Sequence, residues 1–293
     1  MIEFNQTRPG ERAYLQGFGG DSSNMIIAAA RSGAATAYVT RVGDDEFGRM
    51  LLDLWTKERV STRGVMIDRQ APTGAYFVHH GPQGHAFSYL RAGSAASRLT
   101  PADLPEFIES ARFVHASGIS MAISASAANT VLAAFRKAKG EIAFDSNLRL
   151  KLWPLERARE MIGAAAAMAD YFFPSIEDAR ALSGVESPEA NLDWAHRLGA
   201  KVVFLKLGAD GVLVSDGTKQ EEISGIKIKA VDATGAGDCF CGATLARLAA
   251  GDSIWDAARY ANAAAALATT GFGAVDPLPR PDAVRSLLAS RAR

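Results

Sequence analysis

The feature that most constrains the fold is a regular alternation of short β-type runs with Ala-rich helical stretches. The β-type runs lie at residues 37–42, 113–117, 142–145, 171–173 and 202–205. The helical stretches lie at about 23–32, 122–139, 155–169, 176–183, 191–198 and 257–269. Such alternation is typical of a mostly parallel sheet with helices on both faces. The sequence therefore predicts an α/β fold.

Residues 73–91 break this alternation. Two β-type runs flank the sequence Gly81-Pro-Gln-Gly84, which is typical of a hairpin turn. An ordinary edge hairpin would look the same in sequence, but we favour a lid over a site or a dimerisation ribbon. A second hairpin is predicted at 202–214, turning at 208–211. No repeat, linker or low-complexity segment divides the chain, so we expect one domain over residues 1–293.

Composition excludes several classes of partner. Lys plus Arg and Asp plus Glu number 32 each, so no global basic field favours nucleic acid or an anionic membrane. No apolar run approaches the roughly 18 residues of a membrane span, and the first residues do not resemble a signal peptide. The two cysteines, Cys239 and Cys241, are poorly placed to bridge each other. A reducing, cytoplasmic location fits these features best.

The most informative stretch is Asp232-Ala-Thr-Gly-Ala-Gly-Asp238, followed by a predicted helix. The tight run from Gly235 through Ala236 to Gly237 can leave backbone N–H groups pointing outward. Together with the positive end of the helix dipole, these groups form an anion hole. A transferring phosphoryl group needs such a hole, and Asp238 at its mouth is suited to accept the proton of an attacking hydroxyl. The plainer alternative is that Asp238 is a first-turn acid of an ordinary helix; the length of the whole string favours catalysis.

Here the chain resembles the ribokinase-like carbohydrate kinases, the PfkB family. Besides the stretch above, the likeness is carried by Gly19-Gly-Asp-Ser-Ser-Asn24 and Arg41-Val-Gly-Asp-Asp-Glu-Phe-Gly48, and it runs almost from end to end. The resemblance implies a ribokinase-like, Rossmann-like core with a small β-sheet lid, and transfer of the ATP γ-phosphate to a hydroxymethyl group with Mg²⁺. It assigns sugar contact to Gly20, Asp21, Ser22, Ser23 and Asn24, which alone would indicate only a loop and helix cap.

Within the family the sequence is most similar to the 2-keto-3-deoxygluconate kinases. The carrying residues are Tyr76, the segment from Tyr89 through Arg91 to Ser97, and Asp145-Ser-Asn147-Leu-Arg149. The resemblance implies substrate contacts for Tyr76, Tyr89 and Arg91. Arg offers a fixed two-donor fork for the carboxylate of a sugar acid, and residues two apart on a strand share one face. Taken alone, Arg91 would instead be read as a solvated surface charge.

The resemblance also implies a nucleotide side to the site. It assigns Arg149 to the junction of sugar and phosphate and Glu177 to the organisation of Mg²⁺ and phosphate. The family's Asn-x-x-Glu element has Pro174 at the Asn position here, which leaves Ser175 as a substitute donor. The residues implied to contact the nucleotide are Asn147, Arg149, Ser175, Lys206, Gly208, Gly211, Gly235, Ala236, Gly237 and Asn262. For Gly208 and Gly211 the alternative is a plain hairpin turn.

One departure from the family concerns its first strand. Family members usually begin with a complete buried strand, whereas Met1-Ile-Glu-Phe4 resembles the turn that follows it. We therefore expect either an upstream start or a core sheet that lacks one strand. A missing strand would leave apolar faces and unpaired backbone edges, with poor stability or compensating contacts.

The leading hypothesis from sequence is thus an ATP- and Mg²⁺-dependent kinase that phosphorylates the terminal hydroxyl of 2-keto-3-deoxygluconate. The alternatives are a fructokinase, ribokinase or nucleoside kinase of the same fold, and a non-catalytic sugar or nucleotide sensor. A homo-oligomer formed through the lid is a further expectation.

Overall fold

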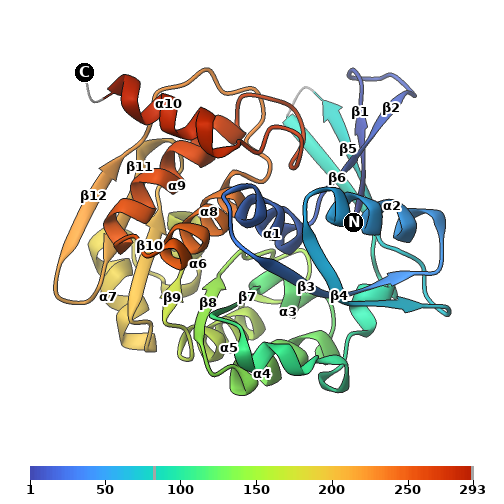
Figure 1. Cartoon of the computed structure of the whole chain (residues 1–293), viewed down its shortest axis with the longest axis horizontal. Coiled ribbons are helices and arrows are strands. Elements are labelled where there is room, and N and C mark those ends of the chain that lie inside the picture. Colours follow the sequence, from blue (N-terminus) through green and yellow to red (C-terminus); the bar gives the residue numbers. More distant parts are fainter. Residues whose placement is uncertain (82–83, 292–293) are drawn as a thin grey trace.

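A computed structural model describes residues 1–81 and 84–291 (Figure 1). Its strands are β1 (Ile2–Gln6), β2 (Tyr14–Phe18), β3 (Thr36–Gly43), β4 (Val60–Asp68), β5 (Ala75–Gly81), β6 (Gly84–Leu90), β7 (Phe113–Ser117), β8 (Glu141–Asp145), β9 (Tyr171–Phe172), β10 (Val202–Lys206), β11 (Gly211–Ser215) and β12 (Gln220–Ser224). Its helices are α1 (Asp21–Arg31), α2 (Glu46–Lys57), α3 (Gly118–Ala122), α4 (Ala125–Lys137), α5 (Leu155–Ala166), α6 (Ile176–Ser183), α7 (Pro188–Leu198), α8 (Ala236–Ala250), α9 (Ile254–Ala268) and α10 (Pro281–Arg291). Short 3₁₀ turns lie at Ala95–Arg98, Pro101–Asp103, Glu106–Ser110 and Gly208–Asp210.

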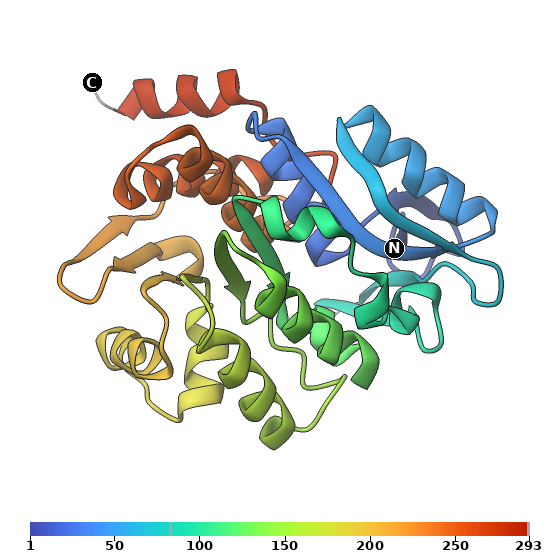
Figure 2. The same ribbon diagram turned by 60° about the horizontal axis from the view of Figure 1, so that its bottom comes forward.

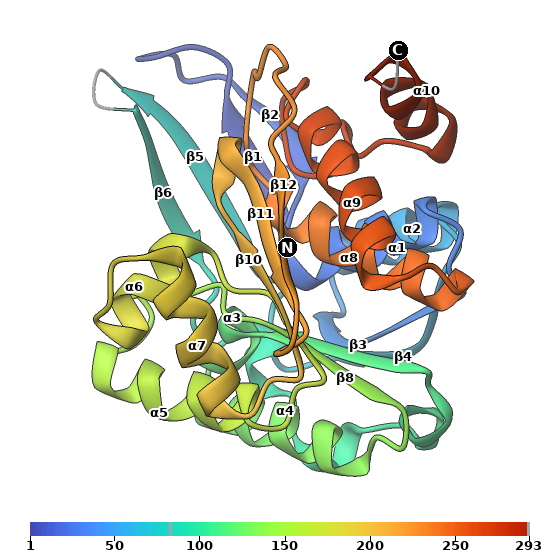
Figure 3. The same ribbon diagram turned by 90° about the vertical axis from the view of Figure 1, so that its left-hand side faces the viewer.

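The central sheet has six strands in the order β12-β11-β10-β9-β8-β7. Strands β7 to β10 pair in parallel, and β11 and β12 continue the sheet in antiparallel fashion. Figure 3 shows α4 to α7 on one face of this sheet and α1, α8 and α9 on the other, and the same layers are visible in Figure 2. The predicted α/β fold with two helical layers is confirmed, and so is the hairpin at 202–214.

Serine side chains fix the start of several helices. Ser124, Ser175, Ser187 and Ser253 each accept a hydrogen bond from the amide three residues further along the chain. Such a side chain satisfies one of the amides that a helix start leaves without an intrahelical partner. The predicted starts at 176 and 257 lie within three residues of the serine-capped starts of α6 and α9, and the predicted start at 155 coincides with that of α5, which follows Pro154.

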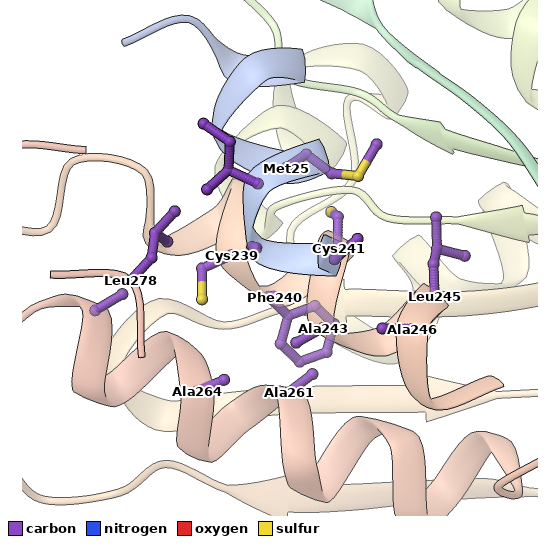
Figure 4. Packing of buried hydrophobic residues seen from close by; sticks show 14 of the residues in the cluster. Met25, Cys239, Phe240, Cys241, Ala243, Leu245, Ala246, Ala261, Ala264 and Leu278 are labelled. Carbon is purple, nitrogen blue, oxygen red and sulfur yellow. The ribbon is translucent and has the colours of Figure 1, made fainter. Parts of the chain in front are cut away.

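Helix α8 is buried almost all round, which places the glycine-rich loop at its start deep in the molecule. Its residues pack between α1 and α9, as the labelled side chains of Met25, Phe240 and Ala261 show in Figure 4. The close approach to α1 depends on Gly242, because a Cβ there would lie 2.2 Å from the carbonyl oxygen of Met25. Both cysteines are buried in this layer and are not bridged.

The lid is a four-stranded sheet in the order β2-β1-β5-β6 that extends from the core (Figure 3). Strands β5 and β6 form the predicted hairpin, in which Gly81 is paired with Gly84. The turn residues Pro82 and Gln83 lie outside the described residues. The other half of the lid was not predicted from the sequence. Residues 2–6 form β1, which pairs in parallel with β5 and antiparallel with β2, so the interpretation of residues 1–4 as a turn was wrong.

Strands β3 and β4 form a separate two-stranded sheet. Among the described residues β3 pairs with β4 and β7 pairs with β8, so the facing edges of β3 and β7 are not joined. Both strands line one cavity of about 1840 Å³ that continues beneath the lid. The expectation of either an upstream start or a core sheet that lacks one strand stays a prediction. In the described part of the chain no helix combines the length and the apolar character that a bilayer crossing requires.

Candidate active site

The glycine-rich loop is held in place by Asp232 and by a left-handed residue. The Asp232 carboxylate accepts hydrogen bonds from the Thr234 amide at 2.9 Å and from the Gly273 amide at 3.0 Å. Gly235 has φ 78°, a conformation that costs glycine little, and α8 begins directly after it. The amides of Gly237 and Asp238 lie in the first turn, where no intrahelical acceptor exists. The Ala236 amide, by contrast, is bonded to the Ala233 carbonyl at 3.2 Å. The predicted anion hole therefore has the amides of Gly237 and Asp238 as donors, whereas the Ala236 amide is already engaged.

Asp238 lies in the first turn of α8 and is held by two amide side chains. The Asn24 Nδ2 donates to one carboxylate oxygen at 2.8 Å, and the Asn147 Nδ2 lies 3.5 Å from the other. Burial, together with the nearby charge of Asp21, raises the pKa of Asp238 to about 7. A carboxyl group with such a pKa exchanges a proton readily near neutral pH, as a general base must.

Asn147 itself adopts a strained backbone conformation, with φ 30°. Strain of this kind in a non-glycine residue persists where the surroundings fix it, and it is concentrated at functional sites.

Four of the five predicted sugar-loop residues line the cavity: Gly20, Asp21, Ser22 and Asn24. The Asn24 Oδ1 is buried and has no hydrogen-bond partner in the described part of the chain, so it is available to a ligand hydroxyl. Ser23 is different, and its assignment to substrate is not supported. Its side chain is buried on the opposite face of α1, where it accepts a hydrogen bond from the Trp55 indole at 2.9 Å.

The predicted lid residues Tyr76, Tyr89 and Arg91 all line the cavity. Tyr76 and Tyr89 are opposite each other across β5 and β6, with ring centroids 6.0 Å apart. The Arg91 guanidinium makes no hydrogen bond or ion pair with any other described residue, and burial lowers the pKa of Arg91. A partly buried arginine without a partner has an unmet demand for an anion.

A buried glutamate within the lid was not predicted from the sequence. Glu3 in β1 is 3% exposed and accepts a hydrogen bond from the Tyr76 hydroxyl. Burial raises the pKa of Glu3. The contact fixes the position of the Tyr76 hydroxyl. No sequence signal could have identified it while residues 1–4 were interpreted as a turn.

On the predicted nucleotide side, Arg149 and Gly208 line the cavity together with the loop from Gly235 to Gly237. The exposed Arg149 side chain bonds to the Leu148 carbonyl. Two predicted contacts do not line it. Gly211 lies in the hairpin of β11 and β12, where a Cβ would lie 2.1 Å from the Ile223 carbonyl oxygen. Asn262 donates to the Ser224 carbonyl at 2.9 Å and joins α9 to β12. Gly211 and Asn262 therefore have structural roles, Gly211 in the pairing of β11 with β12 and Asn262 in the contact between α9 and β12.

Ser175 and Glu177 line the cavity at the start of α6. The Ser175 hydroxyl caps this helix by accepting from the Asp178 amide at 3.0 Å, so its oxygen is already engaged as an acceptor. Glu177 is exposed at the cavity. Among the described residues no group of three or more His, Cys, Asp or Glu side chains could hold a metal ion. A Mg²⁺ ion here would depend on one or two carboxylates plus phosphate oxygens and water, its usual arrangement.

Charged groups at the carboxyl ends of the parallel strands complete the site. Lys206, which ends β10, donates to the Asp145 carboxylate, which ends β8, at 2.8 Å. Ser117, which ends β7, donates to the Asp21 carboxylate. Ligands of open α/β sheets bind at the carboxyl ends of the strands. The positions of Asp145 and Ser117 at the ends of predicted strands could therefore have indicated from sequence that they lie near the site.

Comparisons with known proteins agree with this geometry. Residues 2–281 match the family described as pfkB family carbohydrate kinase. The chain is 36% identical to a 2-dehydro-3-deoxygluconokinase of Thermoproteus tenax, covering 98% of this chain and 91% of the relative. It is 32% identical to a probable fructokinase-7 of Arabidopsis thaliana, covering 95% and 85%. A crystal structure of fructokinase with bound ATP from Xylella fastidiosa superposes with a TM-score of 0.92 at 27% identity, covering 100% of this chain and 97% of the other.

Proposed function

The chain belongs to the pfkB family of carbohydrate kinases, and from that premise we propose that its acceptor is a sugar acid. The proposed reaction transfers the γ-phosphoryl group of ATP to the terminal hydroxyl of 2-keto-3-deoxygluconate, also called 2-dehydro-3-deoxygluconate, and yields its 6-phosphate. A relative that carries this substrate in its name is 36% identical over 98% of the chain. Fructokinases are nearly as similar, so the acceptor has to be argued from the site.

The observation that carries the proposal is the Arg91 guanidinium. It lines the same cavity as Asp238 and forms no hydrogen bond or ion pair with any described residue, although the charge of Asp21 acts on it from beyond contact distance. A neutral sugar would leave this partly buried charge without a contacting anion, whereas a sugar acid would supply a carboxylate for a bidentate, charge-assisted pair. Tyr76 and Tyr89 beside it offer ring faces to the sugar chain.

In the proposed mechanism Asp238 removes the proton of the terminal hydroxyl as its oxygen attacks the γ-phosphorus. Asn24 and Asn147 hold the carboxylate in position. The free amides of the first turn of α8 and the Arg149 side chain stabilise the charge that develops on the transferring group. Closure of the lid would exclude water and so limit hydrolysis of ATP.

Mg²⁺ is part of the proposal because phosphoryl transfer requires charge neutralisation on the β- and γ-phosphates. When bound, the ion would supply that neutralisation and would be held mainly by phosphates and water, with Glu177 assisting through water. Its requirement is tested by chelation with EDTA, which should abolish turnover and leave the melting temperature unchanged.

The pKa of Asp238 predicts the pH dependence of the reaction. Because the base must be ionised and its pKa is about 7, kcat/KM for the acceptor should fall about tenfold per pH unit below pH 7. The profile should be measured at saturating Mg·ATP, so that protonation of free nucleotide does not contribute. A kcat/KM that stays flat down to pH 5 would contradict the assignment of Asp238 as the base.

The experiment that tests the function is an assay of ADP release over a panel of acceptors: 2-keto-3-deoxygluconate, gluconate, fructose, ribose and a nucleoside. We expect the sugar acid with the 2-keto group to have the highest kcat/KM. A preference for fructose would favour the fructokinase alternative. No ADP release with any acceptor, together with nucleotide binding, would favour a non-catalytic sensor.

The remaining elements of the proposal concern assembly and location. A single domain over residues 1–293, cytoplasmic location and a homo-oligomer formed through the lid remain proposals. The oligomer is supported by exposed apolar side chains on the lid: Leu15 is 67% exposed and Leu90 is 65% exposed. Size-exclusion chromatography with light scattering would test it, with Leu90→Lys expected to yield monomers.

A further inference from the structure

A buried ion pair that the mechanism does not use lies beneath the catalytic loop. The side chains of Lys206 and Asp145 are only 14% and 4% exposed, and their charged atoms are 2.8 Å apart. Cys241 in α8 adds a third group, because its thiol donates to the same Asp145 oxygen at 3.3 Å. Buried pairs of this kind rarely contribute net stability, since desolvation offsets their attraction. A role other than stability is therefore worth seeking.

The Lys206–Asp145 pair lies next to the glycine-rich loop at residues 235–237. The Lys206 ammonium lies 3.6 Å from the position that a Cβ of Gly237 would occupy. Besides its bond to Asp145 it lies 3.9 Å from the Cys241 sulfur. Burial opposes the charge of the ammonium, but Asp145, and to a smaller extent Asp178, raise the pKa of Lys206 above its usual value, so that a carboxylate still favours the ammonium when Asp145 is replaced. A fixed positive and a fixed negative charge thus lie next to the first turn of α8.

Asp238 is surrounded by charged or titratable groups from several elements. These are Asp21 of α1, Tyr76 of β5, Asp145 of β8, Lys206 of β10 and the two thiols Cys239 and Cys241 of α8. Among these groups Lys206 is the one cation, and it alone favours the ionised form of the base electrostatically. Asp21 and Asp145 favour the protonated form.

We propose that Lys206 and Asp145 are positioning residues that set the proton affinity of Asp238 through opposed charges. Lys206 favours the carboxylate that accepts the proton of the sugar hydroxyl. Asp145 fixes the ammonium in place and limits its effect, so that the base is not made too weak. The assignment differs from the nucleotide contact that the family resemblance implies for Lys206, and it rests on the proposed function only in treating Asp238 as the base.

The test measures the titration of Asp238 directly in the protein without substrate. The γ-carboxyl ¹³C signal of Asp238 is identified by its absence in Asp238→Asn, and its chemical shift is followed from pH 4 to pH 9 by NMR. Asp145→Asn should lower the pKa of Asp238 by about one unit, the size of effect that a removed neighbouring charge produces. Adding Lys206→Met to Asp145→Asn should raise the pKa of Asp238 again, because it removes the cation that favours the ionised carboxylate. The double variant is used because Lys206→Met alone would leave Asp145 buried without its partner, and Asp145 could then take up a proton. Lys201→Met, which removes an exposed lysine paired with Asp170, is the matched control and should leave the pKa unchanged.

The pKa of Asp238 is thus expected to fall in Asp145→Asn and to rise again when Lys206→Met is added. The acid limb of the kcat/KM profile should move in the same directions. A merely structural role would not reverse the sign between the two variants. The proposal is overturned if Asp145→Asn leaves the pKa of Asp238 unchanged or raises it, or if the second substitution fails to reverse the shift. Because the titration uses no acceptor, this result is independent of whether 2-keto-3-deoxygluconate proves to be the substrate.

Discussion

Asp238→Asn is expected to lower kcat by about 10²- to 10⁴-fold, the contribution typical of a positioned general base. The asparagine keeps the shape of the side chain but cannot accept the proton of the attacking hydroxyl. KM for the acceptor should change much less, because Asn24 and the lid residues still line the cavity. Steady-state kinetics of ADP release measure both parameters.

The same substitution should stabilise the protein at alkaline pH, which separates a lost base from a lost fold. The folded-state pKa of Asp238, about 7, lies above the value of about 3.9 expected in the unfolded chain. The stability that this group contributes is therefore fully present below the unfolded-state pKa and is lost as pH rises through 7. Asp238→Asn should have a higher melting temperature than the wild type at pH 8 and a similar one at pH 4. Turnover close to that of the wild type would refute the catalytic assignment.

Arg91→Ala is expected to weaken binding of the sugar acid by about 10- to 150-fold, the range of a charge-assisted hydrogen bond to a buried group. A neutral sugar should be affected little, because it offers no carboxylate to the guanidinium. Isothermal titration calorimetry with 2-keto-3-deoxygluconate and with fructose, each in the presence of a non-hydrolysable ATP analogue, gives the two affinities. Arg91→Lys should restore part of the loss, since lysine keeps the charge but not the fork.

The matched control for Arg91→Ala is Arg69→Ala. The Arg69 side chain is 87% exposed, and among the described residues its one ion-pair partner is Asp44, at 3.8 Å. Its removal should leave both affinities as they are. An equal loss of affinity for the acid and for fructose in Arg91→Ala would show that Arg91 shapes the cavity rather than pairing with a carboxylate.

The parts of the site that are local in sequence could be predicted. The string from Asp232 to Asp238 contains its own turn glycine and its own helix start, so the loop and the base follow from neighbouring residues. The spacing of Tyr89 and Arg91 predicted that both face one cavity, and both line it, although β6 ends at Leu90, one residue before Arg91.

The parts that depend on contacts between distant segments could not be predicted. Ser22 and Ser23 are adjacent, yet Ser22 lines the cavity and Ser23 bonds to Trp55 on a helix that begins more than twenty residues later. Lys206 meets Asp145 across 61 residues of chain, with β9 between their strands. Asn262 has a side chain suited to adenine but is bonded to the Ser224 carbonyl. Sequence patterns carry the periodicity of each element but not the rotation of one element against another.

The central claim is phosphoryl transfer to a terminal hydroxymethyl group, and proton-coupled ³¹P NMR of the reaction mixture tests it most directly. With wild-type protein, ATP, Mg²⁺ and 2-keto-3-deoxygluconate, we predict ADP together with a phosphomonoester signal split into a triplet by the two protons of its CH₂–O group. The signal should be absent with Asp238→Asn over the same time. A doublet, which reports phosphorylation of a secondary hydroxyl, or inorganic phosphate as the sole new product would contradict the account.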